Sequence, residues 1–456
     1  MADTISAIST AMGESGIGIV RLSGKEAIFI AKKIFVRNKN NSKEIENRKL
    51  TYGYIVDGDE KIDEVLIAFM KAPYTYTRED MVEIYCHGGI IPVRRILELT
   101  LKNGARIADK GEFTKRAFLN GRLDLSQAEA VIDLIKAKTD ESYDVSLNQL
   151  EGNLSKEVRK IRDILLNIIA HIEANIDFSD EDIEEIDYIE FEKQANLVKE
   201  RIDKLLSTAD RGKVLRDGLN TVILGKPNVG KSSLLNAILR ENRAIVTDIP
   251  GTTRDIIEEY VNIDGIPLRI VDTAGIREAK NIVEQIGVDK AKDMVNKADL
   301  IIAVFDASET LTNDDFDIID IIKDKNAIVL LNKLDLPNEY DEKYLQNLIP
   351  NKKIITTSIT TGIGIDKLED SIKNMFYSGE INIESDAIIN NMRHKNQLIK
   401  AKNNILDAIN GIKANVPIDC VEVDIKECWD NLGEITGDGI GEDILDKIFS
   451  EFCIGK

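Results

Sequence analysis

One short stretch constrains the fold of this chain more than any other. Residues 225–233 read GKPNVGKSS, which fits the phosphate-loop pattern G-x-x-x-x-G-K-[ST]. Glycines let such a loop wrap an anion with its N–H groups pointing inward, and the helix behind it adds a positive end. Residues 221–224 before it are typical of a buried strand, and residues 233–239 of a helix. The stretch therefore predicts a doubly wound α/β domain around a phosphate site.

Further motifs indicate which nucleotide this domain binds. Residues 272–275 (DTAG) and 332–335 (NKLD) each end an apolar run, and residues 358–360 (SIT) follow another. The Asp of NKLD can accept hydrogen bonds from N1–H and the exocyclic amine of guanine, a donor pair that adenine lacks. Residues 251–255 (GTTRD) supply a switch threonine. This order of motifs predicts a GTPase.

The segment after DTAG lacks the group that usually positions water. Ras-like GTPases place a Gln there to orient the attacking water, whereas this chain has Ile276, whose side chain cannot polarise water. Glu284 lies further along in a polar segment and can reach the site when the switch orders. Arg254 and Arg277 are candidates for the charge of an arginine finger, and the alternative is that both are ordinary surface residues.

Composition excludes several protein classes. The chain has 456 residues, enough for about three domains, and no apolar run reaches the ~20 residues of a membrane span. The start shows no signal-peptide pattern, and the four cysteines lie far apart without a C-x-x-C. We therefore expect a cytoplasmic protein without zinc or disulfides. A net charge of −20 repels nucleic acid, so an RNA partner must meet a local basic patch or a second protein.

We expect four consecutive segments. These are an α+β domain at 1–118, helices at 119–215, the G domain at 216–377 and helices at 378–456. Because helical sequence flanks the G domain, the two helical segments are expected to pack as one discontinuous domain with the G domain inserted. The main expected strands lie at 50–56 and 65–70, within 16–24, where the strand ends in a turn, and within 81–89, where the strand runs into a Gly-rich turn. The main expected helices lie at 92–103, 154–176, 189–209, 391–412 and 442–452.

Three side chains outside the G domain leave alternatives open. His87 precedes a Gly-Gly turn and is either catalytic or a turn residue. Glu83 lies within an apolar strand and either faces solvent or accepts a hydrogen bond from a buried ligand. Cys453 follows the last amphipathic helix in what we expect to be a flexible tail, which suits a functional thiol.

Taken together, the chain resembles the MnmE (TrmE) family of tRNA-modification GTPases over essentially its full length. The GTPase motifs are common to many families. The specific signals are residues 109–124 (DKGEFTKRAFLNGRLD), residues 125–130 (LSQAEA) and the terminal 452–456 (FCIGK). The resemblance implies an N-terminal folate-binding domain through which the chain forms homodimers, a discontinuous all-α domain and an inserted Ras-like P-loop G domain.

The resemblance also implies a reaction. With an FAD-containing partner of the MnmG (GidA) type, in a heterotetramer, the chain would add a carboxymethylaminomethyl or aminomethyl group to C5 of the wobble uridine of tRNA. The carbon would come from 5,10-methylene-tetrahydrofolate or a formyl analogue, and the nitrogen from glycine or ammonium. The partner would carry most of the tRNA contact.

The resemblance and the motifs together assign site residues. Glu284 would orient the water when two G domains meet, and Cys453 would serve the modification as a nucleophile or structurally. Arg122 stands where some relatives have Lys, which keeps the charge but not the geometry. Folate would contact Arg21, Glu83, Arg122 and Lys456. Magnesium would be bound by Ser232 and Thr253, and potassium by Asn228, Thr247, Ile249 and Thr252. GTP would contact Asn228, Val229, Gly230, Lys231, Ser232, Ser233, Thr247, Asp248, Ile249, Pro250, Gly251, Thr252, Thr253, Asp272, Thr273, Ala274, Gly275, Asn332, Lys333, Asp335, Ser358, Ile359 and Thr360.

The alternative is a regulatory GTPase of the Era or Der type that acts as a switch in ribosome assembly. Such a switch needs neither a folate pocket nor a terminal cysteine. It would be expected to carry a basic RNA-binding module, and the net charge of −20 without a basic cluster argues against one.

Overall fold

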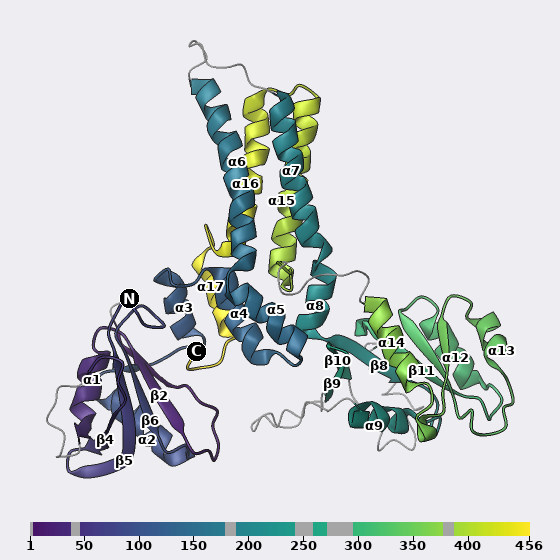
Figure 1. Cartoon of the computed structure of the whole chain (residues 1–456), viewed down its shortest axis with the longest axis horizontal. Helices are drawn as coiled ribbons and strands as arrows, with labels where there is room; N and C mark the ends of the chain where they lie inside the picture. The colour runs from purple at the N-terminus through teal and green to yellow at the C-terminus, as the bar shows by residue number, and fades with distance from the viewer. Residues whose placement is uncertain (1–2, 38–45, 178–187, 242–258, 271–294, 377–386) are drawn as a thin grey trace. The chain divides into compact units, whose positions relative to one another are not determined.

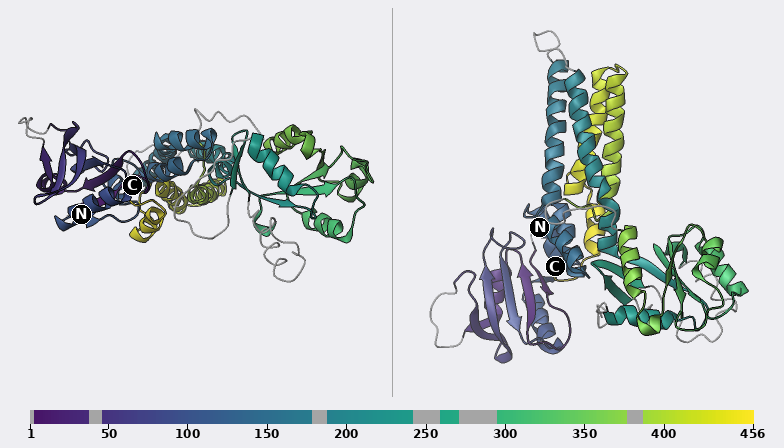
Figure 2. Two further views of the ribbon diagram at one scale, coloured as in Figure 1. Left: turned by 90° about the horizontal axis from the view of Figure 1, so that it is seen from below. Right: turned by 45° about the vertical axis from the view of Figure 1, so that its right-hand side comes forward.

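The computed structural model describes residues 3–37, 46–177, 188–241, 259–270, 295–376 and 387–456 (Figures 1 and 2). The chain forms two compact units. The first comprises Met1–Ile132, Leu150–Asp163 and Trp429–Lys456, and the second comprises Asp133–Gln149 and Ile164–Cys428. The division into four segments with an inserted G domain stays a prediction.

The first unit is built on a seven-stranded sheet in the order β3-β4-β5-β6-β2-β1-β7 (Figure 1). Its strands are antiparallel except for the parallel pair β1 and β7. The strands are β1 Ile5–Ile8, β2 Gly18–Ser23, β3 Phe35–Arg37, β4 Thr51–Asp57, β5 Glu60–Met70, β6 Met81–Cys86 and β7 Arg106–Ile107.

Two helices, α1 Ala27–Ile34 and α2 Ile90–Lys102, contribute their apolar side chains to the same core as one face of this sheet. Because side chains alternate along a strand, Val20 of β2 and Ile84 of β6 point into that core. Arg21 and Glu83 are their neighbours along the strands and point to the opposite face, where they stand directly across from each other. The sheet therefore places an ion pair on its open face.

The C-terminal segment packs within the first unit. Helices α4 Leu125–Lys136 and α17 Glu442–Ser450 share an apolar cluster that includes Phe449 and Phe452. The short helix α3 at Glu112–Leu119 precedes α4 in the chain. Beyond α17, Ile454 forms a β-bridge with Lys110. The expected flexible tail is therefore wrong: apolar burial of Phe452 and backbone pairing hold the tail in place.

The second unit contains the long helices α7 Tyr188–Ser207 and α15 Met392–Lys413 whole, whereas α6 Asn153–Asp177 and α16 Ile418–Thr436 each begin in one unit and end in the other. These four helices run side by side (Figures 1 and 2), with α5 Asp140–Leu150 and α8 Ala209–Asp217 as shorter members. On α7 the buried residues recur every three or four positions, as an amphipathic helix requires. Lys402 of α15 forms an ion pair with Asp203 of α7 across this packing.

A second sheet, in the order β13-β12-β11-β8-β10-β9, is parallel except for the pair β9 and β10. It confirms the predicted doubly wound domain, because separate apolar clusters cover its two faces. Its strands are β8 Leu219–Leu224, β9 Glu259–Ile263, β10 Ile266–Ile270, β11 Leu300–Asp306, β12 Ala327–Asn332 and β13 Lys353–Thr356. Its helices are α9 Lys231–Glu241, α12 Asn313–Ile322, α13 Glu342–Leu348 and α14 Ile365–Phe376, with the 3-10 turn η1 at Ile359–Thr361.

Candidate functional sites

The phosphate loop joins the end of β8 to the start of α9. Gly225 and Gly230 have φ values of +156° and +110°. A Cβ on Gly225 would lie 2.6 Å from the carbonyl oxygen of Val304, and one on Gly230 would lie 2.4 Å from Nδ2 of Asn332. Asn228 adopts φ +67°, a left-handed conformation that Asn tolerates better than most residues. The shape of this loop therefore requires both glycines, and it requires at position 228 a residue that tolerates the left-handed conformation.

Lys231 lies across the loop that precedes it. Its Nζ donates to the carbonyl oxygens of Gly225 at 2.7 Å and Lys226 at 2.5 Å. Burial lowers the pKa of Lys231, and a phosphate in the loop would oppose that shift by favouring the ammonium form. Ser232 and Ser233 are exposed at the start of α9, where a hydroxyl can reach a ligand.

Asn332, which we predicted as a GTP contact, is a buried connector in this structure. Its Nδ2 donates to the carbonyl oxygen of Val229 at 2.8 Å. Its Oδ1 accepts from the backbone N–H of Ile359 at 3.1 Å and from Oγ1 of Thr357 at 3.3 Å. One side chain thus ties the phosphate loop to the segment that follows β13.

Asp335 is exposed, and Oγ of the buried Ser358 donates to its Oδ1 at 2.7 Å. This bond fixes the carboxylate and leaves its second oxygen for a base. Lys333, at φ +67°, places Nζ 2.5 Å from Oδ2 of Asp306. Burial would raise the pKa of the Asp306 carboxyl, but the ion pair with Lys333 and the hydrogen bonds from Ser308 outweigh it and lower the pKa. The segment that follows β12 therefore holds the Asp335 carboxylate in a fixed orientation close to Lys333, which is held by its ion pair with Asp306.

The other predicted residues of this site lie outside the described residues. These are Thr247, Asp248, Ile249, Pro250, Gly251, Thr252, Thr253, Arg254, Asp272, Thr273, Ala274, Gly275, Arg277 and Glu284. Their roles stay predictions.

The open face of the first sheet carries the second group of predicted residues. Arg21 donates from Nε to Oε1 of Glu83 at 2.9 Å, and its Nη2 lies 2.8 Å from the same oxygen. The hydroxyl of Tyr85 donates to Oε2 of Glu83 at 2.6 Å. Burial and this hydrogen bond raise the pKa of Tyr85 to about 12. Both oxygens of Glu83 are thus engaged, so the carboxylate does not simply face solvent.

Tyr76 brings Arg122 to this group. The Arg122 guanidinium carbon lies 4.7 Å from the Tyr76 ring centroid, and that of Arg21 lies 5.9 Å from the same centroid. The Tyr76 hydroxyl shares a 2.9 Å hydrogen bond with Oγ1 of Thr114, which fixes the ring. Both arginines therefore flank one aromatic side chain.

The C-terminal tail supplies Lys456. The carbonyl of Gly455 accepts from Nη1 of Arg21 at 3.4 Å and from Oγ of Ser9 at 3.1 Å, and the backbone N–H of Phe113 donates to the carbonyl of Lys456 at 3.2 Å. Burial and the charge of Arg21 lower the pKa of Lys456, while Glu83 opposes them. Arg21, Glu83, Arg122 and Lys456, predicted together, are brought together from distant parts of the chain.

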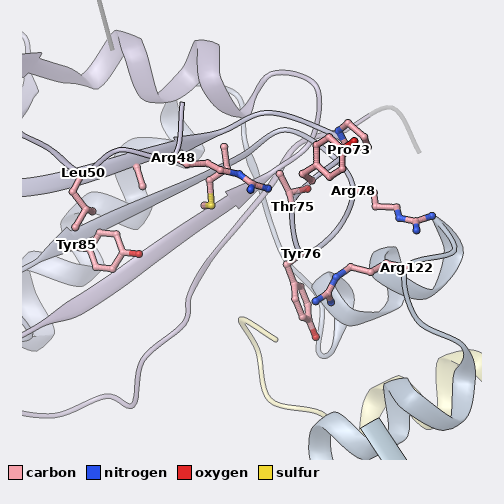
Figure 3. Close-up of a pocket in the computed structure, with 11 residues that line it drawn as sticks. Arg48, Leu50, Pro73, Thr75, Tyr76, Arg78, Tyr85 and Arg122 are labelled. Atoms are coloured by element: carbon pink, nitrogen blue, oxygen red, sulfur yellow. The ribbon is translucent and has the colours of Figure 1, made fainter. Parts of the chain in front are cut away.

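A pocket of about 770 Å³ lies beside this group (Figure 3). Figure 3 shows the Arg122 guanidinium against the Tyr76 ring at its wall. Two of its arginines, Arg48 and Arg78, are absent from the sequence predictions. The pocket is lined by Arg48, Leu50, Ala68, Met70, Pro73, Tyr74, Thr75, Tyr76, Arg78, Tyr85 and Arg122.

His87 and Cys453 are not among the residues that line this pocket, although the charge of Cys453 acts on the pKa of Lys456. The exposed His87 ring lies with Nδ1 2.6 Å from Oδ1 of Asp63, which raises the pKa of His87 and favours the turn-residue interpretation. Cys453 is exposed, and its carbonyl accepts from the N–H of Gly111 at 3.3 Å. Within the described ranges, no cluster of His, Cys, Asp and Glu could hold a metal, and no helix is long and apolar enough to cross a membrane.

Comparison with known proteins covers the whole chain. The family described as GTP-binding protein TrmE N-terminus matches residues 4–122, and the MnmE helical domain family matches residues 125–453. A tRNA modification GTPase MnmE from Alkaliphilus metalliredigens is 55% identical over 457 residues, covering 100% of this chain and 99% of the relative. The MnmE of Bacillus subtilis is 50% identical over 458 residues, with 100% of both chains covered.

Among solved structures, the G domain of the T. maritima FeoB iron transporter is 24% identical and covers 35% of this chain and 98% of its own, with a TM-score of 0.27. A score this low supports no inference about this chain.

Proposed function

The chain belongs to the MnmE family of tRNA modification GTPases, and we propose that it couples GTP hydrolysis to the transfer of a folate-borne carbon to tRNA. In this proposal an FAD-containing partner of the MnmG type completes the enzyme. The product is a carboxymethylaminomethyl or aminomethyl group on C5 of the wobble uridine. The reaction takes place in the cytoplasm, where tRNA is modified.

One observation supports the folate part most strongly: the Arg21–Glu83 pair, Arg122 and Lys456 gather around Tyr76 and Tyr85. A carboxylate such as Glu83 can accept paired hydrogen bonds from the amino and ring N–H groups of a pterin. Basic residues beside it can bind the carboxylates of the folate glutamate. The chain thus offers acceptors for one end of a tetrahydrofolate and cations for the other.

The nucleotide part is supported by the loop at 225–233 and by the oriented Asp335. Asp335 selects guanine, and Lys231 binds the terminal phosphates. Ser232 and Thr253 would hold magnesium, whose charge stabilises the transferred phosphate. Asn228, Thr247, Ile249 and Thr252 would hold potassium in place of an arginine finger, and Glu284 would orient water when two G domains meet.

The charge of the chain supports a division of labour among partners. Because each chain has a net charge of −20, the homodimer repels tRNA, so the FAD-containing partner in a heterotetramer makes most of the tRNA contacts. Tight, salt-sensitive tRNA binding by this chain alone would contradict that division.

Reconstitution tests the proposal. The purified chain, the flavoprotein, unmodified tRNA, methylene-tetrahydrofolate, glycine or ammonium, and GTP are incubated together with magnesium and potassium ions, and tRNA nucleosides are analysed by mass spectrometry. We expect a C5-modified wobble uridine that Glu83→Gln abolishes and Glu98→Gln does not, because the exposed Glu98 pairs only along α2 with Arg94. GTP hydrolysis without any modified uridine, under conditions where all components bind, would reject the proposal.

A further inference from the structure

The pocket in Figure 3 is positively charged although the chain is acidic. Arg48, Arg78 and Arg122 line it, and no Asp or Glu does. In a chain with a net charge of −20, a pocket with several arginines and no carboxylate of its own favours an anionic ligand. Its volume of about 770 Å³ is within the usual range of small-molecule sites.

These arginines differ from the others around the same sheet. Arg21, Arg106 and Arg116 each form ion pairs with carboxylates. By contrast, Arg48 and Arg122 lie against the rings of Tyr74 and Tyr76, at 5.9 and 4.7 Å. Arg78 donates from Nη1 to the carbonyl oxygen of Asn120 at 2.9 Å. Across the described ranges none of the three has a carboxylate partner, so their charges are available to a ligand.

Arg48 and Arg78 also share an unusual backbone. Their φ values are +62° and +59°, in the left-handed region that costs free energy for any residue with a Cβ. Such conformations gather at ligand sites more often than elsewhere. Here they occur at two arginines of the same pocket.

The pocket continues the group proposed to bind folate. Tyr85 lines the pocket and donates to Glu83, and Arg122 lines it while stacking on the ring that Arg21 flanks. Leu50, Met70 and Tyr74 add apolar side chains to the pocket lining, which suits an aromatic ring. A ligand with its pterin at Glu83 therefore places its aminobenzoyl ring and its glutamate tail in this pocket.

We propose that Arg48 and Arg78 bind the additional carboxylates of a poly-γ-glutamylated folate, so that this chain selects long-tailed folates over the monoglutamate. The inference rests on the proposed folate function and adds that the site distinguishes folates by the length of their glutamate tail. Arginine suits this task because its planar fork can bind a carboxylate through two hydrogen bonds.

The test measures binding of 5-formyl-tetrahydrofolate, as the monoglutamate and as the tetraglutamate, to the full-length chain by calorimetry. We expect the tetraglutamate to bind at least about tenfold more tightly at low salt, and this gain to shrink as salt rises, because exposed charge pairs are screened. In the double variant Arg48→Gln, Arg78→Gln the gain should fall to about twofold or less, because the affinity for the tetraglutamate falls more than the affinity for the monoglutamate.

Arg94→Gln is the matched control. Arg94 lies on α2, and the pocket lining does not include it; it pairs with Glu98 on the same helix. This variant loses one positive charge outside the pocket and should keep the full gain of the tetraglutamate over the monoglutamate. Thermal unfolding of each variant verifies that the fold is retained.

The outcomes separate the two proposals. If the wild-type chain binds both folates equally, the tail inference is wrong and the folate site stands. If it binds neither, both proposals fail. If the double variant keeps the tail-length gain but binds tRNA more weakly, the arginines serve nucleic acid, and the tail inference is overturned.

Discussion

Asn332 and Asp335 belong to one motif, yet the structure gives them different tasks. Asn332 is buried, and its side chain makes three hydrogen bonds within the protein. Asp335 is exposed and makes a single hydrogen bond with a side chain, from Ser358. The prediction that both contact GTP is unchanged for each of them, and these contacts add that Asn332 joins the phosphate loop to the segment that follows β13.

We predict that Asn332→Ala destabilises the nucleotide-binding part of the chain more than Asp335→Ala. The first change leaves the buried carbonyl of Val229 and N–H of Ile359 without partners, which costs about 2–4 kcal/mol. The second should cost no more than about 1 kcal/mol because Asp335 is exposed. Calorimetry of the unfolding transition that GDP shifts upward measures both. Equal losses of stability would contradict the assignment.

His87 gives a prediction about pH. Its hydrogen bond to Asp63 raises its pKa in the folded state above the ordinary value of about 6.5. The stabilisation of the folded state by the interaction of His87 with Asp63 is therefore complete below about pH 6.5, and it is lost as the pH rises through the folded-state pKa of His87. We expect the melting temperature difference between wild type and His87→Gln to shrink over that interval. A difference that grows with pH would contradict the ion pair.

At the scale of elements, helices and strands with a regular spacing of apolar residues could be predicted from the sequence, whereas very short strands could not. The predicted strands around β2, β4, β5 and β6 are confirmed, with β5 longer than expected, and the predicted long helices are confirmed. Strands β1, β3 and β7 are absent from the predictions because two to four residues carry no periodic signal. Helix α1 is absent too. Helix α16 lies in the segment predicted as helices, but it was not predicted as a separate helix, although the buried Val421, Ile425, Cys428, Leu432 and Ile435 have helical spacing.

The docked C-terminal tail depends on Gly455. This residue has φ +93°, and a Cβ on it would lie 2.1 Å from the carbonyl oxygen of Ile8. Because neither backbone can yield cheaply, Gly455→Ala should displace the tail and Lys456 with it. We expect folate affinity to fall about tenfold or more, as lost charge-assisted contacts would cause.

Gly439→Ala is the control for this prediction. Gly439 also has positive φ, +74°, but no atom lies within 4 Å of its added Cβ. This variant should lose about 1–2 kcal/mol of stability through strain alone and keep its folate affinity. Similar folate affinities for the two variants would show that tail docking is irrelevant to the site.

At the scale of the whole molecule, the sequence predicts which residues meet but not everything that surrounds them. Arg21, Glu83, Arg122 and Lys456 were predicted together from a family resemblance, and the structure brings them into one group. Arg48 and Arg78 could not be predicted, because isolated arginines in a sequence do not reveal a shared pocket or a left-handed backbone.

The G domains are predicted to act in pairs with potassium. GTP turnover should be severalfold faster in potassium than in sodium at equal ionic strength, and removing the Asn228 side chain should abolish the difference. Asn228→Gly is the sharper variant, since Gly accepts the φ of +67° that would strain Ala. Slow turnover that is indifferent to the cation would contradict potassium-assisted dimerisation and favour a simple switch.

The most direct measurement is the binding of GDP and 5-formyl-tetrahydrofolate to one preparation of the full-length chain, with Asp335→Ala and Glu83→Gln beside the wild type. The account predicts that the wild type binds both ligands. Asp335→Ala should weaken GDP alone by about 100-fold, since two charge-assisted hydrogen bonds are lost, and Glu83→Gln should weaken the folate alone. A wild type that binds only one ligand, or a variant that loses both, would contradict the account of two separate sites on one tRNA modification GTPase.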